Sequence, residues 1–155
     1  MSRPTVAEIN TAAIKKNLKK LKSLSKDALL YPVVKANAYG HGYKAVTKEI
    51  ESLVHGLSVA TTEEALSVRK VTKKNILCME GPYDPKELNL LIRNKIDLVI
   101  HSHRQIGLLH GIKSLPKEIK VWIKLDTGMN RLGFKEEEII EIYQKVESKT
   151  KRIVL

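Results

Sequence analysis

Length, composition and charge predict an ordinary folded domain and argue against several other classes of protein. The chain has 155 residues, of which 43% are hydrophobic and 29% charged, so we expect a packed core and little disorder. The formal net charge is +11, but aromatic residues make up only 5% of the chain, so the basic and stacking side chains that single-strand nucleic-acid binders combine are scarce. We therefore interpret the lysines as a solvated surface and expect no nucleic-acid partner.

The cysteine content and the lack of long apolar runs favour a cytoplasmic location. Cys78 is the only cysteine, lies in the apolar segment NILCM and is interpreted as a core residue. The N-terminal segment MSRPTVAEIN has no apolar core of a secretory signal. No apolar run approaches the roughly 18 residues that span a bilayer. We expect a protein of the reducing cytoplasm without a membrane partner.

Helices and strands are expected to alternate from the N-terminus. Asn10 or Thr11 can cap a first helix, whose apolar residues recur at helical spacing. These residues are Ile14, Leu18, Leu21 and Leu24. Residues 29–35, LLYPVVK, predict the first strand, in which Pro32 would lack a ladder hydrogen bond and mark the start of the strand or a bulge. A loop of small residues follows, and then a helix with Val46, Ile50 and Leu53 at helical spacing.

The same alternation continues to the C-terminus. Further strands are expected at residues 56–60, 75–79, 97–101 and 121–125, with the start of another at 151–155. Three helix starts carry capping signals. These are Thr61 with Glu64, Asp84 with Pro85 and Glu87, and Ser102 with Gln105. The last helix carries an apolar stripe formed by Ile139, Ile142, Tyr143 and Val146.

Such alternation predicts an α/β fold with right-handed βαβ units and a parallel sheet. Two architectures compete, a parallel (β/α)8 TIM-type barrel and a doubly wound sheet. No G-x-G-x-x-G motif follows the first expected strand, which counts against a dinucleotide site. A closed eight-fold barrel needs about 250 residues. We therefore expect residues 1–155 to supply the first five to six β/α units of a barrel, as the N-terminal part of a longer polypeptide.

Lys35 closes the first expected strand and precedes a loop of small residues. Active sites of parallel barrels lie at the carboxyl ends of the strands. A Schiff-base lysine needs a neutral amine, and partial desolvation against an apolar strand favours that form. Gly40 and Gly42 allow the backbone to approach a ligand closely, and Tyr39 offers a hydroxyl. We interpret His41 as a loop residue, and the alternative for Lys35 is an ordinary solvated lysine.

A second group of charged residues follows another expected strand, within residues 122–134, WIKLDTGMNRLGF. Lys124, Asp126 and Arg131 place three charges in an otherwise apolar stretch. Lys124 lies inside the expected strand and needs an acidic partner or a modification, because a buried charge is tolerated only when paired. Arg131 can bind an anion with two parallel hydrogen bonds. The alternative is a strand end held by a salt bridge, whereas the barrel architecture would bring both motifs to one rim.

Two motifs of the chain resemble those of a known family. VVKANAYGHG, residues 33–42, resembles the cofactor-attachment motif of alanine racemases, and KLDTGMNRLGF, residues 124–134, resembles their second signature. The similarity extends along the chain and includes EINTAAIKKNLKKLK near its start. It implies the N-terminal part of the pyridoxal-phosphate-binding barrel domain of a bacterial alanine racemase, a head-to-tail homodimer. The remaining barrel units and the C-terminal β domain would lie outside residues 1–155.

The resemblance also implies roles for individual residues. Lys35 would attach pyridoxal 5'-phosphate and act as the base on one face of the substrate, and Tyr39 would hydrogen-bond the cofactor phosphate. Arg131 would lie near the phenolic oxygen of the cofactor and bind the substrate carboxylate. Lys124 matches a lysine that is often carbamylated, which would turn this cation into an anion facing Arg131. The second base, a tyrosine of the partner's C-terminal domain, would lie beyond this chain, and no metal is implied.

The function implied by the resemblance is interconversion of L-alanine and D-alanine for peptidoglycan synthesis. The 155-residue chain alone is expected to be nearly inactive, because one base and the barrel closure are missing. Two alternatives stay open. One is another pyridoxal-phosphate barrel enzyme, a racemase of a different amino acid or a decarboxylase. The other is a non-catalytic cofactor carrier or basic binding module.

Overall fold

The computed structural model describes residues 4–117 and 119–154, and within them five short strands form one parallel sheet. The strands are β1 (Gly56–Val59), β2 (Asn75–Cys78), β3 (Asp97–Ile100), β4 (Val121–Ile123) and β5 (Ile153–Val154). They pair in sequence order, β1-β2-β3-β4-β5. A doubly wound sheet reverses its strand order near the middle, whereas a barrel wall does not. The sheet is therefore the partial barrel that the sequence predicts.

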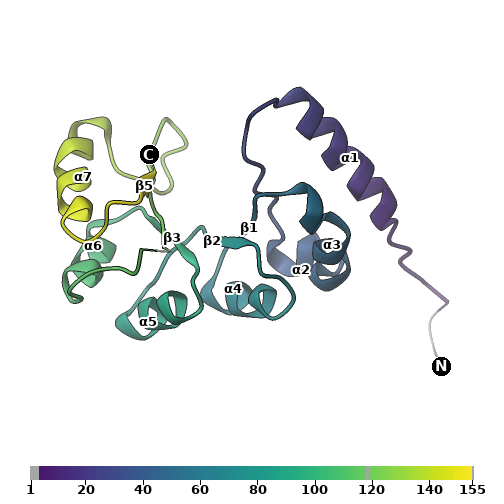
Figure 1. The fold of residues 1–155 in the computed structure, drawn as a ribbon, viewed down its shortest axis with the longest axis horizontal. Coiled ribbons are helices and arrows are strands. Elements are labelled where there is room, and N and C mark those ends of the chain that lie inside the picture. The colour runs from purple at the N-terminus through teal and green to yellow at the C-terminus, as the bar shows by residue number, and fades with distance from the viewer. Residues whose placement is uncertain (1–3, 118, 155) are drawn as a thin grey trace.

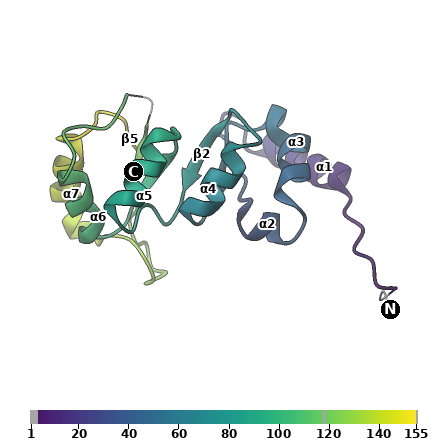
Figure 2. The same ribbon diagram turned by 90° about the horizontal axis from the view of Figure 1, so that it is seen from below.

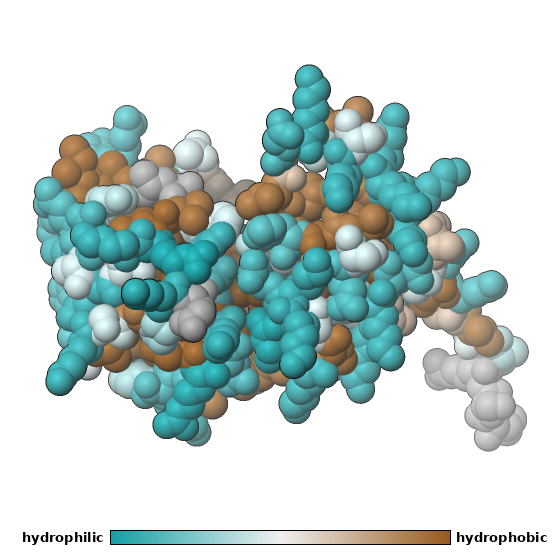
Figure 3. Space-filling view, in the orientation of Figure 1, coloured by the Kyte–Doolittle hydropathy of each residue, from teal (hydrophilic) through white to brown (hydrophobic). Residues whose placement is uncertain are grey.

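The helices are α1 (Thr11–Leu24), α2 (Lys35–Tyr39), α3 (Tyr43–Ile50), α4 (Thr62–Arg69), α5 (Pro85–Arg93), α6 (His103–His110) and α7 (Ile139–Glu147), with short 3-10 turns η1 (Glu51–Leu53) and η2 (Glu136–Glu138). Helix α1 packs against α3. Figure 1 shows α3 to α7 around the outside of the strands, while the inner side of the sheet carries no helix. Figure 3 shows a hollow in the surface between the part that carries α7 and the part that carries α1. None of the helices formed by the described residues is both long and apolar enough to cross a membrane.

The hydrophobic core lies between the outer face of the strands and the helices. The strands contribute alternate residues that are almost fully buried, among them Leu57, Val59, Ile76, Cys78, Leu98, Ile100, Val121 and Ile123. Burial of these side chains is the main favourable contribution to folding. The expected core position of Cys78 is confirmed, and burial raises the pKa of its thiol to about 12.

The prediction of a regular first strand at residues 29–35 is wrong. Only Val33 forms a bridge, parallel to Ser58 of β1. The Val34 amide donates to the Ser58 carbonyl at 2.8 Å, and the Ser58 amide donates to the Pro32 carbonyl at 2.9 Å. Pro32 has no N–H to continue the ladder, which explains the short pairing. The segment still extends the sheet by lying beside β1.

Two of the three predicted helix caps are confirmed, and so is Asn10 as the cap of α1. The Asn10 side chain accepts from the Ala13 amide, Thr61 forms a capping box with Glu64, and Asp84 accepts from the Glu87 amide. The capping box predicted for Ser102 and Gln105 is wrong. The side chain of Ser102 makes no capping bond: the Gln105 amide donates to the Ser102 carbonyl at 3.1 Å. The side-chain oxygen of Gln105 accepts from the His101 amide at 2.8 Å and from the Ser102 hydroxyl at 3.4 Å, so it does not accept from the Ser102 amide.

The sheet curves strongly enough for residues near its two ends to touch across the inner face. The ring of Tyr31, in the segment beside β1, meets the ring of Trp122 on β4 edge-on, with 5.7 Å between centroids. Tyr31 also lies over Gly56, where an added Cβ would come within 2.3 Å of the tyrosine ring. Both observations place Tyr31 and Trp122 on the concave inner face. That curvature brings the motifs at the ends of the sheet toward one another.

Candidate functional site

The two motifs singled out in the sequence lie at the same edge of the parallel sheet. Lys35 follows the segment that pairs with β1, and Lys124 follows β4. Parallel strands present their carboxyl ends at one edge, which is the face that bears active sites in β/α barrels. Figure 2 shows α2 and the yellow-green loop after β4 projecting to the same lower side of the molecule. The shared rim expected from the fold is therefore present.

The turn after Lys35 has an unusual left-handed backbone. Residues 36, 37, 38 and 39 have φ values of 48°, 56°, 54° and 52°. A non-glycine residue in this conformation costs roughly 1–2 kcal/mol, and runs of such residues are rare. Gly40 and Gly42 continue the turn with φ values of 84° and 87°. The loop predicted from small residues is thus a compact left-handed turn, a conformation that the sequence did not predict.

Side-chain acceptors hold this turn in place. One carboxylate oxygen of Glu64 accepts from the Ala36 amide at 2.7 Å, and the other accepts from the Ala60 amide at 2.9 Å. The side-chain oxygen of Asn37 accepts from the Tyr43 amide at 3.0 Å. The sequence pattern predicts only a helix-cap role for Glu64 and no role for Asn37. The tendency of asparagine to adopt positive φ was the one signal that pointed to the turn.

The candidate residues on this turn differ in exposure and in partners. Lys35 is half-buried, and its amine makes no hydrogen bond or ion pair within the described ranges. Tyr39 is 61% exposed, so its hydroxyl is free to meet a ligand. His41 lies with its Nδ1 at 2.9 Å from the Ala38 carbonyl oxygen, which agrees with its interpretation as a loop residue. An apolar cavity of about 350 Å³ behind the turn is lined by Val33, Tyr39, His41 and neighbours, but not by Lys35.

The loop after β4 is organised around Asp126. Its carboxylate accepts from the Gly128 and Asn130 amides, both at 3.0 Å. The amides of Asn130 and Gly128 lower the pKa of Asp126, and the charge of Lys124 contributes less. The Asp126 amide donates to the Phe134 carbonyl, and the Phe134 amide donates to the Lys124 carbonyl, both at 2.9 Å. Asp126 therefore shapes the loop with its backbone contacts.

Lys124 and Arg131 are not held by the salt bridge that the alternative interpretation required. Lys124 is half-buried and Arg131 exposed, and neither side chain makes a hydrogen bond or ion pair to any residue in the described part of the chain. The need of Lys124 for an acidic partner or a modification stays a prediction. Arg131 is free to bind an anion from outside these residues.

A small polar cluster on the neighbouring strands was missed in the sequence. The buried His101 follows β3, and its Nε2 lies 2.9 Å from the Glu80 carbonyl oxygen. The Gln105 amide nitrogen donates to the same carbonyl at 2.7 Å. In a sequence, a histidine at the end of an apolar run followed by glutamine four positions later is too common a pattern to single out.

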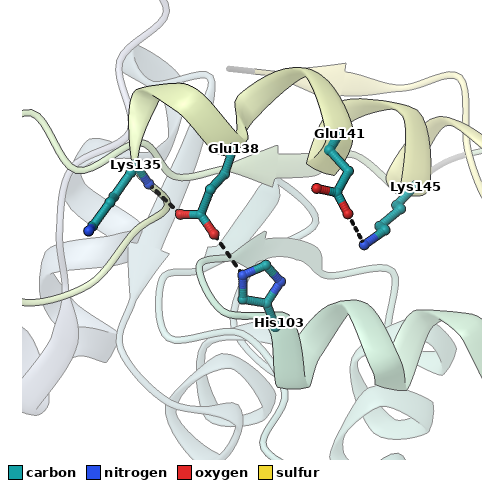
Figure 4. A network of polar contacts seen from close by, with 5 residues as sticks. All are labelled: His103, Lys135, Glu138, Glu141 and Lys145. Carbon is teal, nitrogen blue, oxygen red and sulfur yellow. Dashed lines mark hydrogen bonds and ion pairs between the residues drawn. The ribbon is translucent and has the colours of Figure 1, made fainter.

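A second polar contact anchors the far end of the loop after β4. Figure 4 shows His103 of α6 facing Glu138 of η2, with Nε2 and Oε1 2.7 Å apart, and Glu141 paired with Lys145. The second oxygen of Glu138 accepts from the Lys135 amide at 2.9 Å. This amide and then His103 lower the pKa of Glu138. The contact ties α6 to the segment that follows Phe134.

Comparisons with known proteins agree with this geometry. The family model for the N-terminal domain of alanine racemase matches residues 9–155. The chain is 42% identical over 146 residues to the alanine racemase of Mannheimia succiniciproducens, covering 93% of this chain and 40% of that protein. It is 41% identical over 146 residues to that of Haemophilus influenzae, again covering 93% of this chain and 40% of the relative.

Solved structures give the same result. The biosynthetic alanine racemase from Pseudomonas aeruginosa superposes with a TM-score of 0.88 and 35% identity, over 95% of this chain and 41% of that one. The alanine racemase from Acinetobacter baumannii gives a TM-score of 0.83 and 34% identity, over 90% of this chain and 42% of the other. The chain thus spans 40% of the length of the first curated relatives that it matches. It belongs to the family of alanine racemase N-terminal domains.

Proposed function

We propose that the whole protein interconverts L-alanine and D-alanine with pyridoxal 5'-phosphate, supplying D-alanine for peptidoglycan. The observation that carries the proposal is Lys35, a half-buried lysine at the carboxyl end of the sheet in a chain of the alanine racemase family. By the same resemblance, we propose a cytoplasmic homodimer. Residues 1–155 would form the N-terminal part of its cofactor-binding barrel domain.

The residues at the rim fit the cofactor. A half-buried amine without a hydrogen bond or ion pair in the described residues suits covalent attachment of an aldehyde at Lys35. The exposed hydroxyl of Tyr39 suits one anionic end of the ligand, and the free guanidinium of Arg131 suits another. When bound, pyridoxal phosphate would withdraw electrons from the substrate α-carbon.

In this proposal, the side chains of the chain bind the substrate and move its proton. Lys35 takes the α-proton from one face or returns it there, acting as a general base and acid. Arg131 holds the substrate carboxylate, which fixes the α-carbon relative to Lys35. Carbamylation of Lys124 would add an anion beside Arg131 and orient its guanidinium. The second base and most contacts to the phosphate would come from outside residues 1–155, so this chain alone should show little or no turnover.

Mapping the attached cofactor tests the proposal directly. Treatment of the chain with pyridoxal phosphate and then borohydride should leave one pyridoxyl group on Lys35, and Lys35→Arg should abolish it. Lys44→Arg, a nearby substitution on α3, serves as the matched control and should keep the adduct. An adduct on another lysine would refute the assignment. Rates with a panel of amino acids, measured on the full-length protein, test the choice of alanine, and rapid turnover by the 155-residue chain would contradict its incompleteness.

A further inference from the structure

His101 is a buried histidine, and one of its ring nitrogens lacks a hydrogen-bond partner among the described residues. His101 is 8% exposed, and its Nδ1 is fully buried without a hydrogen-bond partner in the described part of the chain. A buried acceptor that lacks its donor loses its hydration without compensation. A hydrogen-bond donor that reached this nitrogen would therefore recover free energy lost on burial.

The ring of His101 is held in one orientation by its surroundings. Nε2 lies 2.9 Å from the Glu80 carbonyl oxygen, which can only accept, and 3.3 Å from the amide nitrogen of Gln105; because the carbonyl contact is the shorter, we assign the proton to Nε2. The same carbonyl accepts from the Gln105 amide at 2.7 Å, and the Gln105 oxygen accepts from the His101 amide at 2.8 Å. In the neutral ring, Nδ1 is then a hydrogen-bond acceptor.

The backbone that presents the Glu80 carbonyl has no freedom to move aside. Gly81 has a φ of +64°, and a Cβ at this position would lie 2.1 Å from the Val99 carbonyl oxygen. This close approach requires glycine and fixes the turn after β2. The carbonyl that anchors His101 is thus set by the packing of β2 against β3.

Lys124 lies at the neighbouring position on the same face of the sheet. β3 and β4 pair with Val99 opposite Trp122 and Ile100 opposite Ile123, so the next pair is His101 with Lys124. The Lys124 amide donates to the Ile100 carbonyl at 2.9 Å, which continues the pairing past the end of β4. Side chains alternate between the faces of a sheet, so both residues share the inner face with Trp122.

The two side chains are complementary in hydrogen bonding. The Lys124 amine has donors and no acceptor, and it makes no hydrogen bond or ion pair to the described residues. The charge of Lys124 helps to lower the pKa of Asp126, so the Asp126 carboxylate competes with His101 for the lysine amine. The carboxylate of Asp126 already accepts from two backbone amides of its own loop. No described group donates to Nδ1 of His101, and Nε1 of Trp122 on the same face is another buried donor without a partner among the described residues.

We propose that His101 is a positioning residue: the Lys124 amine, which bonds to neither His101 nor any other described residue in this structure, turns to donate from Nζ to Nδ1 of His101, and this contact sets the direction of the lysine side chain at the rim. The contact is compatible with a free amine and with a carbamate, because both carry a hydrogen on Nζ. If Lys124 is carbamylated, this hydrogen bond through Nζ would leave both carbamate oxygens free to accept from Arg131. This consequence for the site rests on the proposed function, whereas the hydrogen bond itself does not.

Nitrogen NMR of the chain with ¹⁵N-labelled histidine tests the hydrogen bond without cofactor or activity. The chain has five histidines, and His101→Gln identifies the resonances of this one. We expect the proton on Nε2 and a downfield shift of the Nδ1 resonance in Lys124→Met. Lys120→Met, at the residue that precedes β4, and Asp126→Asn should leave it unchanged. A proton on Nδ1, or no effect of Lys124→Met, would overturn the proposal.

The role at the site is tested with ¹³C-bicarbonate. His101→Gln keeps a donor for the Glu80 carbonyl but removes the Nδ1 acceptor, and we expect a roughly five-fold lower carbamate occupancy at Lys124, equivalent to about 1 kcal/mol. Equal occupancy in both chains would refute the positioning role. A wild-type chain without carbamate would refute the modification of Lys124, while the histidine spectra still decide the hydrogen bond.

Discussion

At the scale of single residues, Glu64 does more than its sequence pattern indicates. One oxygen accepts from the Ala36 amide, and the other accepts from the amides of Ala60 and Thr61, at distances of 2.7 Å, 2.9 Å and 3.4 Å. The side chain therefore links the start of α4 to the left-handed turn that carries Lys35. A backbone held in a costly conformation persists only when its surroundings over-determine it.

Removal of this carboxylate should destabilise the turn and the protein. We expect Glu64→Ala to lower the free energy of unfolding by about 1–2 kcal/mol, because amides that lose their acceptor are left unpaired. Denaturant unfolding followed by circular dichroism measures the change. Glu63→Ala, at the adjacent exposed position, should change stability by less than about 0.5 kcal/mol. Equal stability of the two variants would show that Glu64 does not hold the turn.

At the scale of elements, the close approach of β2 and β3 depends on a glycine. A Cβ at Gly81 would meet the Val99 carbonyl, whereas a Cβ at Gly107 on α6 would meet no atom within 4 Å. The two glycines therefore predict opposite effects of the same substitution. One lies at a packed turn with positive φ, and the other lies within a helix with open space beside it.

Alanine substitutions at these two glycines test the contrast. Gly81→Ala should destabilise the protein by more than about 2 kcal/mol, through strain and the clash with the backbone of β3. Gly107→Ala should stabilise it by about 0.5–1 kcal/mol, because alanine loses less backbone entropy in a helix. Thermal and denaturant unfolding of both variants measure the changes. A stable Gly81→Ala variant would contradict the packing described here.

Asp97 links β3 to the segment before β4 and titrates in a buried position. Its carboxylate accepts from the Lys120 amide at 2.9 Å. Burial raises the pKa of Asp97, and the Lys120 amide together with the charges of Lys120, Arg152 and Arg69 only partly opposes this shift. A pKa above the unfolded value means that the stabilising contribution is complete at low pH and is lost as the pH rises through the folded pKa.

The Asp97→Asn variant tests this pH dependence. Asparagine keeps an oxygen for the Lys120 amide but does not ionise. The stability of the wild type relative to the variant should be highest below about pH 4, near the unfolded pKa of aspartate. It should fall as the pH rises above this value. Denaturant unfolding from pH 3 to 7 measures the difference, and a relative stability that increases with pH would contradict the assigned direction.

At the scale of the whole molecule, the order of the elements could be predicted from the sequence, but the details of the rim could not. Apolar runs and capping residues located the five strands of the sheet and most helices, because these signals are local. The strand at 29–35 failed because Pro32 interrupts the ladder. The left-handed turn and the His101 cluster depend on contacts with Glu64 and Glu80, which a reading of local patterns does not pair.

The contact between Tyr31 and Trp122 gives the curved sheet a built-in optical probe. The chain has a single tryptophan, and its ring lies 5.7 Å from that of Tyr31 across the concave face. Flattening of the arc would separate the two rings and expose the indole to water. The emission wavelength of Trp122 thus tells whether the arc keeps its bend when further strands are added or removed.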